Sequence, residues 1–194
     1  MNGEKILTDY TRDCTERMTR SDFGALNRIA ELLLEAKAGD RVIYTAGNGG
    51  SLATASHICN DLLKGCSVNG KPGFNAVCLG DSSAVLTCLG NDFSYDDVYA
   101  FQLSAKLHKG DVVLLFSGSG NSMNVVKAAE VANRMGAVTI GFLGRDGGKL
   151  LPLCQHSVIA PSDNMEQIED IHMLYCHALS YTIQRLLGKK TEGC

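Results

Sequence analysis

The stretch from Val112 to Ser122 (VVLLFSGSGNS) constrains the fold of this chain more than any other. It is an unbroken apolar run that ends abruptly in glycines and serines, a pattern typical of a buried strand that enters a tight loop. Apolar residues then recur at nearly helical spacing from 123 to 135, which predicts a helix directly after the loop. The loop therefore lies between a buried strand and the N-terminus of a helix.

A helix N-terminus presents unpaired backbone N–H groups and the positive end of the helix dipole. Ser117, Ser119 and Ser122 add three hydroxyls at this point, and Gly118 and Gly120 let the backbone turn sharply. The loop is thus a candidate phosphate site. A strand-to-helix turn with a serine cap would have the same sequence, so that interpretation stays open. No lysine follows the loop, and its glycine spacing is not that of a dinucleotide-binding motif.

Strand-like and helix-like segments alternate along the rest of the chain. This alternation predicts parallel strands with right-handed crossovers, and hence a doubly wound three-layer αβα sandwich with a sheet of five strands. The predicted strands are 41–46, 74–79, 112–116, 137–143 and 154–161. The predicted helices between and after them are 52–64, 82–89, 95–107, 123–135 and 165–187, with a loop at 90–93.

The first 38 residues form an N-terminal extension with helical patterning throughout. We expect two helices, of which the second begins at a Ser21 cap and closes at Gly39. Their apolar stripe is wider than one sheet face needs, which suggests either oligomer packing or packing within the chain. At 194 residues the chain is long enough for one domain, here 1–194, and hardly for two.

Composition excludes several classes of protein. A net charge of −3 argues against a nucleic-acid-binding surface as the main function. Neither a membrane-spanning apolar run nor a signal segment is present, so we expect a cytoplasmic protein. The eight cysteines include no CxxC pair and lie mostly in apolar segments, so we expect reduced core thiols, with Cys194 a loose terminal thiol.

A second loop repeats the plan of the first. Gly47 to Ser51 follows a predicted strand and precedes a helix, and two such loops at the carboxyl ends of parallel strands face one crevice. Behind it, His57 and Asp61 are four residues apart and share a helix face. They can present a base, an acid or two metal ligands, or form an exposed pair of little energetic consequence.

The predicted loop at 90–93 contains two further polar residues, Asn91 and Asp92. Their side chains either reach the crevice or cap the following turn.

Five motifs in register resemble one known family. These are TAGNGGSLATASH with Asp61 behind it, CLGNDF, FSGSGNSMNVVKA, GFLGRDGGK and QIEDIHMLYCH. Together they are similar to the sugar isomerase (SIS) domain family and, within it, to the phosphoheptose isomerases. The resemblance implies a flavodoxin-like sheet and an aldose–ketose isomerase that interconverts sedoheptulose 7-phosphate and D-glycero-D-manno-heptose 7-phosphate through an enediol, in heptose synthesis for a surface polysaccharide. It also implies a cytoplasmic homotetramer with sites shared between subunits.

The resemblance also implies roles for individual residues. Asp61 and His177 correspond to the family's acid/base pair, and the ligands of zinc-containing members, one ion per site, correspond to His57, Asp61, Glu169 and His177. The phosphate would be held by Ser117, Gly118, Ser119, Asn121 and Ser122. The sugar would be bound by Asn48, Gly49, Gly50, Ser51, Asn91, Asp92 and Glu169.

Three positions depart from the family pattern. Asp61 stands where Glu is common and is one methylene shorter; Glu169 stands where Gln is common, and its charge favours a divalent cation. Gly118 replaces a frequent Thr and removes one hydroxyl. Glu169 and His177 are eight residues apart, or about 12 Å along a straight helix. A site completed by a second subunit, or a bend near Ile171, would bring both to one ion.

Another class of function has the same fold. A non-catalytic SIS module that binds a replication initiator protein, or one that senses a sugar phosphate, would share the architecture. His57, Asp61 and His177 favour the enzyme, because a module that acts only by contact needs no acid/base set.

Overall fold

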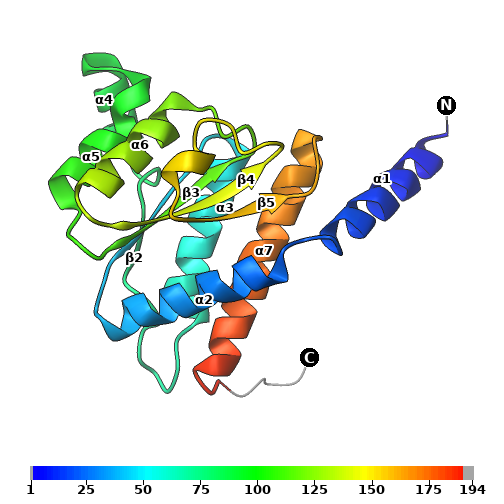
Figure 1. Ribbon diagram of the computed structural model, residues 1–194, viewed down its shortest axis with the longest axis horizontal. Coiled ribbons are helices and arrows are strands. Elements are labelled where there is room, and N and C mark those ends of the chain that lie inside the picture. Colours follow the sequence, from blue (N-terminus) through cyan, green and yellow to red (C-terminus); the bar gives the residue numbers. More distant parts are fainter. Residues whose placement is uncertain (1, 190–194) are drawn as a thin grey trace.

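The computed structural model describes residues 2–189, which form one parallel sheet flanked by helices (Figure 1). The strands are β1 (Ile43–Ala46), β2 (Ala76–Cys78), β3 (Val112–Ser117), β4 (Val138–Gly144) and β5 (His156–Ala160). Their order is β2-β1-β3-β4-β5, and every neighbouring pair is parallel. The predicted five-stranded, flavodoxin-like sheet is therefore confirmed. Its strand order reverses between β1 and β3, the place where doubly wound folds bind ligands.

Seven α-helices accompany the sheet in the described part of the chain. They are α1 (Gly3–Met18), α2 (Phe23–Ala38), α3 (Gly50–Asn60), α4 (Ser83–Asp92), α5 (Val98–Lys106), α6 (Met123–Arg134) and α7 (Met165–Leu186). Short 3-10 turns cover Tyr95–Asp97 and Leu151–Leu153. Among residues 2–189, no helix combines the length and apolarity that crossing a membrane requires.

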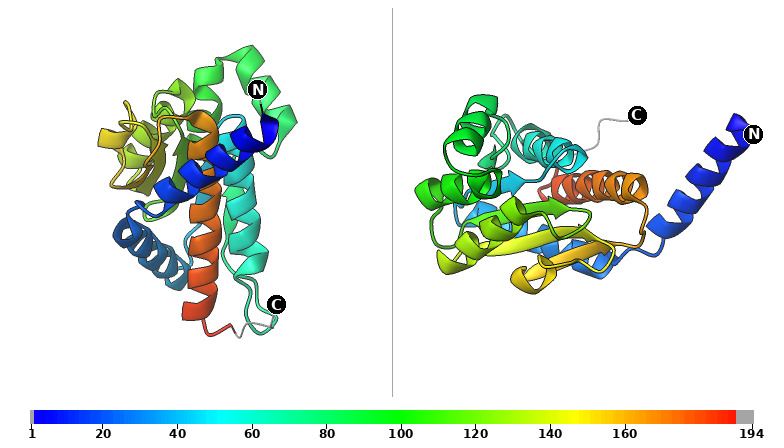
Figure 2. Two further views of the ribbon diagram at one scale, coloured as in Figure 1. Left: turned by 90° about the vertical axis from the view of Figure 1, so that its right-hand side faces the viewer. Right: turned by 90° about the horizontal axis from the view of Figure 1, so that it is seen from above.

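The alternating side chains of β3 build two hydrophobic cores. Val112, Leu114 and Phe116 belong to one core together with α2, α3 and α7, while Val113 and Leu115 belong to the other with α5 and α6. Both faces of the sheet are thus covered by helices, as Figure 2 shows. All six residues of β3 are buried, which explains why its sequence is continuously apolar rather than alternating.

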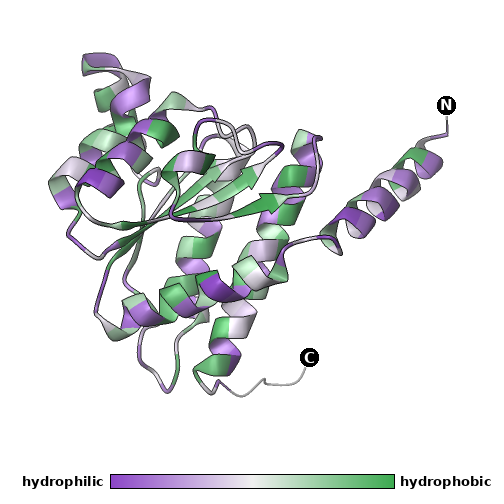
Figure 3. Ribbon diagram, in the orientation of Figure 1, coloured by the Kyte–Doolittle hydropathy of each residue, from purple (hydrophilic) through white to green (hydrophobic). Residues whose placement is uncertain are grey.

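Helix α1 extends away from the rest of the molecule (Figures 1 and 2). Figure 3 shows mainly hydrophilic residues along it, and Cys14 is its one buried residue. Two side-chain contacts join it to α7: the Tyr10 hydroxyl donates to Asp170 Oδ2 at 2.5 Å, and Gln167 Nε2 donates to Asp13 Oδ2 at 2.8 Å. Near the start of α1, the side chains of Ile6 and Leu7 are 51% and 71% exposed.

Two local predictions are wrong. Asp22, not Ser21, caps α2 by accepting the Ala25 N–H, because the Ser21 hydroxyl instead accepts a hydrogen bond from Tyr175. The predicted loop at 90–93 is mostly helix, so Asn91 and Asp92 lie in the last turn of α4. Burial of Leu89 anchors that turn against the core despite its glycine and asparagine, which are poor helix formers.

Helix α3 also ends differently from the prediction of a regular helix to residue 64. From Asp61 to Gly65 the chain forms a π-helical turn, closed by a hydrogen bond from Cys66 N–H to the Asp61 carbonyl. The carbonyls of Leu62 and Leu63 instead accept the N–H groups of Phe74 and Gly73 from the segment that leads into β2. A side chain at Gly73 would overlap the Leu62 carbonyl, so this close backbone approach requires glycine.

Seven of the cysteines lie in the described part of the chain, and each is a free thiol. Burial raises the pKa of Cys59 and of Cys66 to about 11, so both are protonated at neutral pH. Cys194 lies outside the described residues.

Candidate active site

A cleft of about 300 Å³ opens at the carboxyl ends of β1 and β3, where the strand order reverses. The loop after β1, the loop after β3 and the first turns of α7 contribute its walls. Its lining residues are Asn48, Gly49, Gly50, Ser51, Phe116, Ser117, Gly118, Ser119, Ser122, Met165 and Glu169. The two glycine- and serine-rich loops thus face one crevice, as their sequence pattern predicted.

The loop after β3 keeps its hydroxyl groups available to a ligand. Ser117 Oγ and Ser119 Oγ accept the backbone N–H groups of Gly120 and Asn121, so each hydroxyl still has its own O–H to donate. Ser122 occupies the N-cap position of α6, but its side chain makes no capping hydrogen bond. The simple serine-cap interpretation therefore does not apply to Ser122. Three hydroxyls and a helix N-terminus are suited to bind an anion.

A carboxylate already lies at the N-terminus of the other helix in the cleft. Gly50 is the first residue of α3, and a Cβ atom built on it would overlap the carboxylate of Glu169. Glu169 thus faces the positive end of the α3 dipole, which stabilises its negative charge. An anionic ligand is repelled from this position, so the cleft offers it the N-terminus of α6 instead.

The side chains of His57, Asp61 and His177 gather beside α3 and α7. His57 Nε2 lies 2.9 Å from His177 Nε2 and 3.5 Å from Asp61 Oδ2. Their potential ligand atoms lie within 4.8 Å of one another. The Ser180 hydroxyl donates to Asp61 Oδ2 at 3.3 Å, which orients the carboxylate. Two nitrogens and one carboxylate oxygen form a ligand set that suits zinc with one position open.

The π-helical turn begins at Asp61. Turns of this kind occur most often at functional sites, because they shift side chains relative to a regular helix. Here the regular helix runs up to Asp61, whose N–H bonds to the His57 carbonyl, so these two residues share a helical face; the wide turn that follows directs the next carbonyls to the segment before β2. Asp61 thus stands at the junction of α3 and the π-helical turn, a backbone feature that no periodicity in the sequence indicates.

Some residues expected at the site lie elsewhere in this chain. Glu169 is in the cleft and outside the group formed by His57, Asp61 and His177. The amide of Asn121 turns toward neighbouring backbone, donating to the Ser119 carbonyl and accepting from Lys149 N–H. Asn91 and Asp92 are exposed on α4, where the Asn91 amide donates to Asp92 Oδ1.

Two residues that the sequence did not single out also line the cleft. Phe116 is the second-last residue of β3; it is fully buried, lines the cleft and stacks its ring on Phe142 in the core. Met165 is the first residue of α7, and its sulfur fills the space next to Gly118 that a Cβ atom would occupy. The only sequence signal for Met165 is its place at the start of the predicted helix 165–187.

His172 is buried in the core behind the cleft. It lies edge-on to the stacked rings of Phe116 and Phe142, and its Nε2 is 2.9 Å from the Leu143 carbonyl. Since that carbonyl only accepts, His172 donates from Nε2. Burial lowers its pKa to about 4, so the imidazole is neutral at physiological pH. It supports α7 rather than contacting the cleft.

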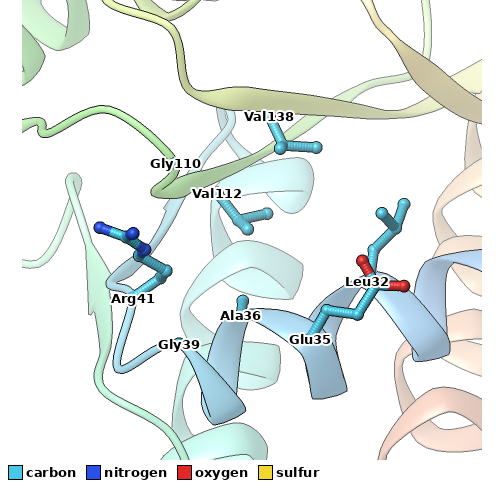
Figure 4. A pocket seen from close by; sticks show the side chains of 8 residues that line it. All are labelled: Leu32, Glu35, Ala36, Gly39, Arg41, Gly110, Val112 and Val138. Carbon is cyan, nitrogen blue, oxygen red and sulfur yellow. The ribbon is translucent and has the colours of Figure 1, made fainter.

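Another hollow, of about 170 Å³, lies at the amino ends of β3 and β4 (Figure 4). Apart from Glu35 and Arg41, its walls are aliphatic side chains and glycines. Arg41 donates to the Lys109 carbonyl, and no histidine or serine lines this hollow. It is therefore on the wrong edge of the sheet and has the wrong side chains for acid/base chemistry.

Comparison with known proteins agrees with this geometry. Residues 8–144 match the SIS domain model. The chain is 38% identical over 165 residues to a phosphoheptose isomerase of Helicobacter pylori (strain P12), covering 85% of each, and 36% identical over 163 residues to that of Aliarcobacter butzleri, covering 84% of this chain and 86% of the relative.

Solved structures give the same result. The chain superposes on phosphoheptose isomerase GmhA from Neisseria gonorrhoeae with a TM-score of 0.85 and 28% identity, over 94% of this chain and 98% of that one. A phosphoheptose isomerase from Francisella tularensis shares the fold with a TM-score of 0.89 at 24% identity, over 95% and 100% of the two chains. The chain therefore belongs to the SIS domain family and, within it, to the phosphoheptose isomerases.

Proposed function

We propose that the protein isomerises sedoheptulose 7-phosphate to D-glycero-D-manno-heptose 7-phosphate for the synthesis of surface heptose. One observation supports this proposal: the serine-rich loop after β3 lines the same cleft as the first turns of α3 and α7, the two helices beside which His57, Asp61 and His177 gather. The phosphate of such a sugar is at the opposite end from its reacting carbons. A site with a separate anion seat and acid/base group suits a ligand of this shape.

The reaction moves a proton between C1 and C2 through an enediol, so it needs a base, an acid and a group that stabilises the developing oxyanion. Asp61 and His177 are proposed for the first two roles. The Ser180 hydroxyl orients the carboxylate of Asp61, and the contact with His57 holds His177 in place. Ser117, Ser119 and Ser122 would fix the phosphate, with the sugar chain extending past Asn48, Gly50 and Ser51.

We propose zinc as the cofactor. His57, Asp61 and His177 of one chain supply three suitable ligand atoms within 4.8 Å of one another, whereas Glu169 is about two helical turns away on α7. When bound, the ion would polarise a substrate carbonyl or hydroxyl oxygen. Glu169 would then contact the sugar in the cleft, and would reach an ion only if the site tightens around the ligand or a neighbouring subunit supplies it.

We further propose a homotetramer with shared sites. Helix α1 projects from the body and exposes Ile6 at 51% and Leu7 at 71%, a surface suited to packing against another copy. Asn91 and Asp92, exposed on α4, would then contribute to the site of a neighbouring subunit. Free thiols in the described part of the chain suit a reducing compartment, so we place the reaction in the cytoplasm.

The assay follows conversion of sedoheptulose 7-phosphate to the aldose by purified protein. Three samples are compared: untreated, dialysed against chelator, and dialysed protein with zinc restored. We expect turnover that the chelator reduces and zinc restores. Absence of turnover in all three samples would refute the isomerase, and would favour a sugar-phosphate sensor if the ligand still binds. Light scattering of the same protein reports the oligomeric state, and a monomer would refute shared sites.

A further inference from the structure

Two side chains outside the lining of the cleft hold Asn48 in one orientation. Asn124, in the first turn of α6, forms a reciprocal amide pair with Asn48: Asn48 Nδ2 donates to Asn124 Oδ1 at 2.9 Å, and Asn124 Nδ2 donates to Asn48 Oδ1 at 2.8 Å. The hydroxyl of Tyr95, in the 3-10 turn before α5, donates to the same Asn48 Oδ1 at 2.9 Å. Three segments distant in sequence thus meet at one carboxamide.

The hydrogen-bonding capacity of Asn48 determines what it can offer a ligand. A carboxamide oxygen has two lone pairs, and Asn48 Oδ1 uses both, one for Tyr95 and one for Asn124. Its Nδ2 has two N–H groups, of which Asn124 takes one. Since Asn48 lines the cleft, the one group that it has left for a ligand is a single N–H donor.

Burial makes this arrangement stable. Asn124 is 2% exposed, so turning its amide would leave buried donors and acceptors unpaired, which is costly. The pair also joins the loop after β1 to the helix that follows the phosphate loop of β3. The distance between the proposed phosphate seat and the sugar-binding loop is therefore set in part by Asn124.

We infer that Asn124 and Tyr95 are positioning residues, which hold Asn48 as a pure hydrogen-bond donor and so make the cleft select sugar phosphates with an acceptor oxygen at that point. This inference rests on the proposed function, since it assumes that a sugar phosphate occupies the cleft. Asn48 contacts the ligand, whereas Asn124 and Tyr95 act through Asn48. A wrongly oriented Asn48 would present its oxygen and lose the hydrogen bond to a substrate carbonyl or a developing oxyanion.

The test compares how each variant changes the binding of the whole sugar phosphate and the binding of inorganic phosphate alone. Dissociation constants of sedoheptulose 7-phosphate and of inorganic phosphate are measured by calorimetry for wild type, Asn48→Ala, Asn124→Leu, Asn124→Asp and Tyr95→Phe. Each hydrogen bond lost to the sugar should weaken its binding about tenfold. We expect that loss for Asn124→Leu and Asn124→Asp, a smaller one for Tyr95→Phe, and a change under about twofold in inorganic phosphate. Equal losses for both ligands would show that Asn124 merely supports the loop, and would overturn the inference.

A double-mutant cycle provides the decisive comparison. If Asn124 acts through Asn48, Asn48→Ala with Asn124→Leu binds the sugar phosphate no more weakly than Asn48→Ala alone. Additive losses would contradict the inference. The exposed Tyr95 tolerates the change to Phe, so a result remains even if Asn124→Leu fails to fold.

The matched control is Asn133→Leu on the same helix, whose amide donates to the Leu153 carbonyl at 2.7 Å. It removes this hydrogen bond and those that Asn133 Oδ1 accepts from Thr139 and Gln155, all at the other end of α6 from Asn124, and should leave both dissociation constants unchanged. Turnover separates the two proposals. If the variants show the expected selective loss of sugar phosphate binding but the wild type does not isomerise the sugar phosphate, the proposed function alone is refuted. An active wild type whose Asn124 variants show no selective loss would refute the positioning role alone.

Discussion

The imidazoles of His57 and His177 meet edge to face with their Nε2 atoms 2.9 Å apart, although 120 residues separate them in the chain. The contact joins α3 to α7, the two helices that contribute the acid/base candidates. An uncharged pair satisfies it when one ring donates and the other accepts. The same two nitrogens are candidate ligands of the proposed zinc ion.

Replacing Asp61 by Asn tests the proposed base. The amide keeps the size of the side chain but cannot accept the substrate proton, so we expect kcat to fall by about 10²- to 10⁴-fold. The circular dichroism spectrum should not change. Asp81→Asn is the control, because Asp81 is an exposed carboxylate outside the cleft that accepts a hydrogen bond from the Ser56 hydroxyl. Substantial activity in Asp61→Asn would mean that another group is the base.

Ser122→Ala separates phosphate binding from helix capping. Because Ser122 makes no capping hydrogen bond, we expect little change in the free energy of unfolding but weaker inhibition by inorganic phosphate. Ser82→Ala should do the reverse, since Ser82 Oγ accepts the Val85 N–H at the start of α4. Its loss should cost about 1 kcal/mol of stability without changing phosphate binding. Chemical denaturation and inhibition kinetics measure both, and a destabilised Ser122→Ala with normal phosphate inhibition would contradict the assignment.

His172 makes stability depend on pH. Its pKa is lowered to about 4 in the folded protein from 6.5 in the unfolded chain, so between these values the unfolded state binds more protons. The free energy of unfolding should therefore fall by about 3 kcal/mol as the pH drops from 6.5 to 4. Urea titrations at several pH values measure the loss, and His172→Phe should remove this part of the pH dependence. Identical pH profiles for both proteins would exclude His172 as its source.

Gly118→Thr tests the close approach of Met165. A Cβ atom at position 118 would overlap the Met165 sulfur, so we expect the substitution alone to destabilise the protein by about 1–3 kcal/mol and to distort the phosphate loop. Met165→Ala removes the obstacle, so the double variant should recover much of the loss. Thermal unfolding of the three variants measures this. Additive destabilisation would show that Met165 is not the limiting contact.

Much of the fold follows from the sequence because local pattern and tertiary structure agree. The continuous apolar run of β3 predicts a strand buried on both faces, and the glycine and serine loops at 47–51 and 117–122 predict ligand contacts at the carboxyl edge. Each strand and helix was expected near its observed position. The sequence pattern predicts the wrong local structure where a contact with a distant residue replaces a local hydrogen bond. The Ser21 hydroxyl accepts from Tyr175, so it does not cap α2. The first carbonyls of the π-helical turn after Asp61 accept N–H groups from the segment before β2, so the regular helix does not continue there.

The site was less predictable than the fold. The spacing of His57 and Asp61 indicates a shared helical face, yet only the family resemblance connected them with His177 on a distant helix. Asn124 looks like an ordinary polar residue in the first turn of a helix, and nothing local shows that it pairs with Asn48. Asn91 and Asp92 are exposed in the last turn of α4 and do not line the cleft of their own chain, although the family resemblance implied that they bind the sugar.

The carboxylate of Glu169 at the start of α3 makes the two ends of the cleft electrostatically different. The helix start of α6 favours an anion and the carboxylate at the start of α3 disfavours one, so we expect an elongated sugar phosphate to lie with its phosphate against α6. A sugar bisphosphate would have to bring its second phosphate toward that carboxylate. If the phosphate binds at α6 as proposed, we expect the charge of Glu169 to make sugar bisphosphates weaker ligands than monophosphates.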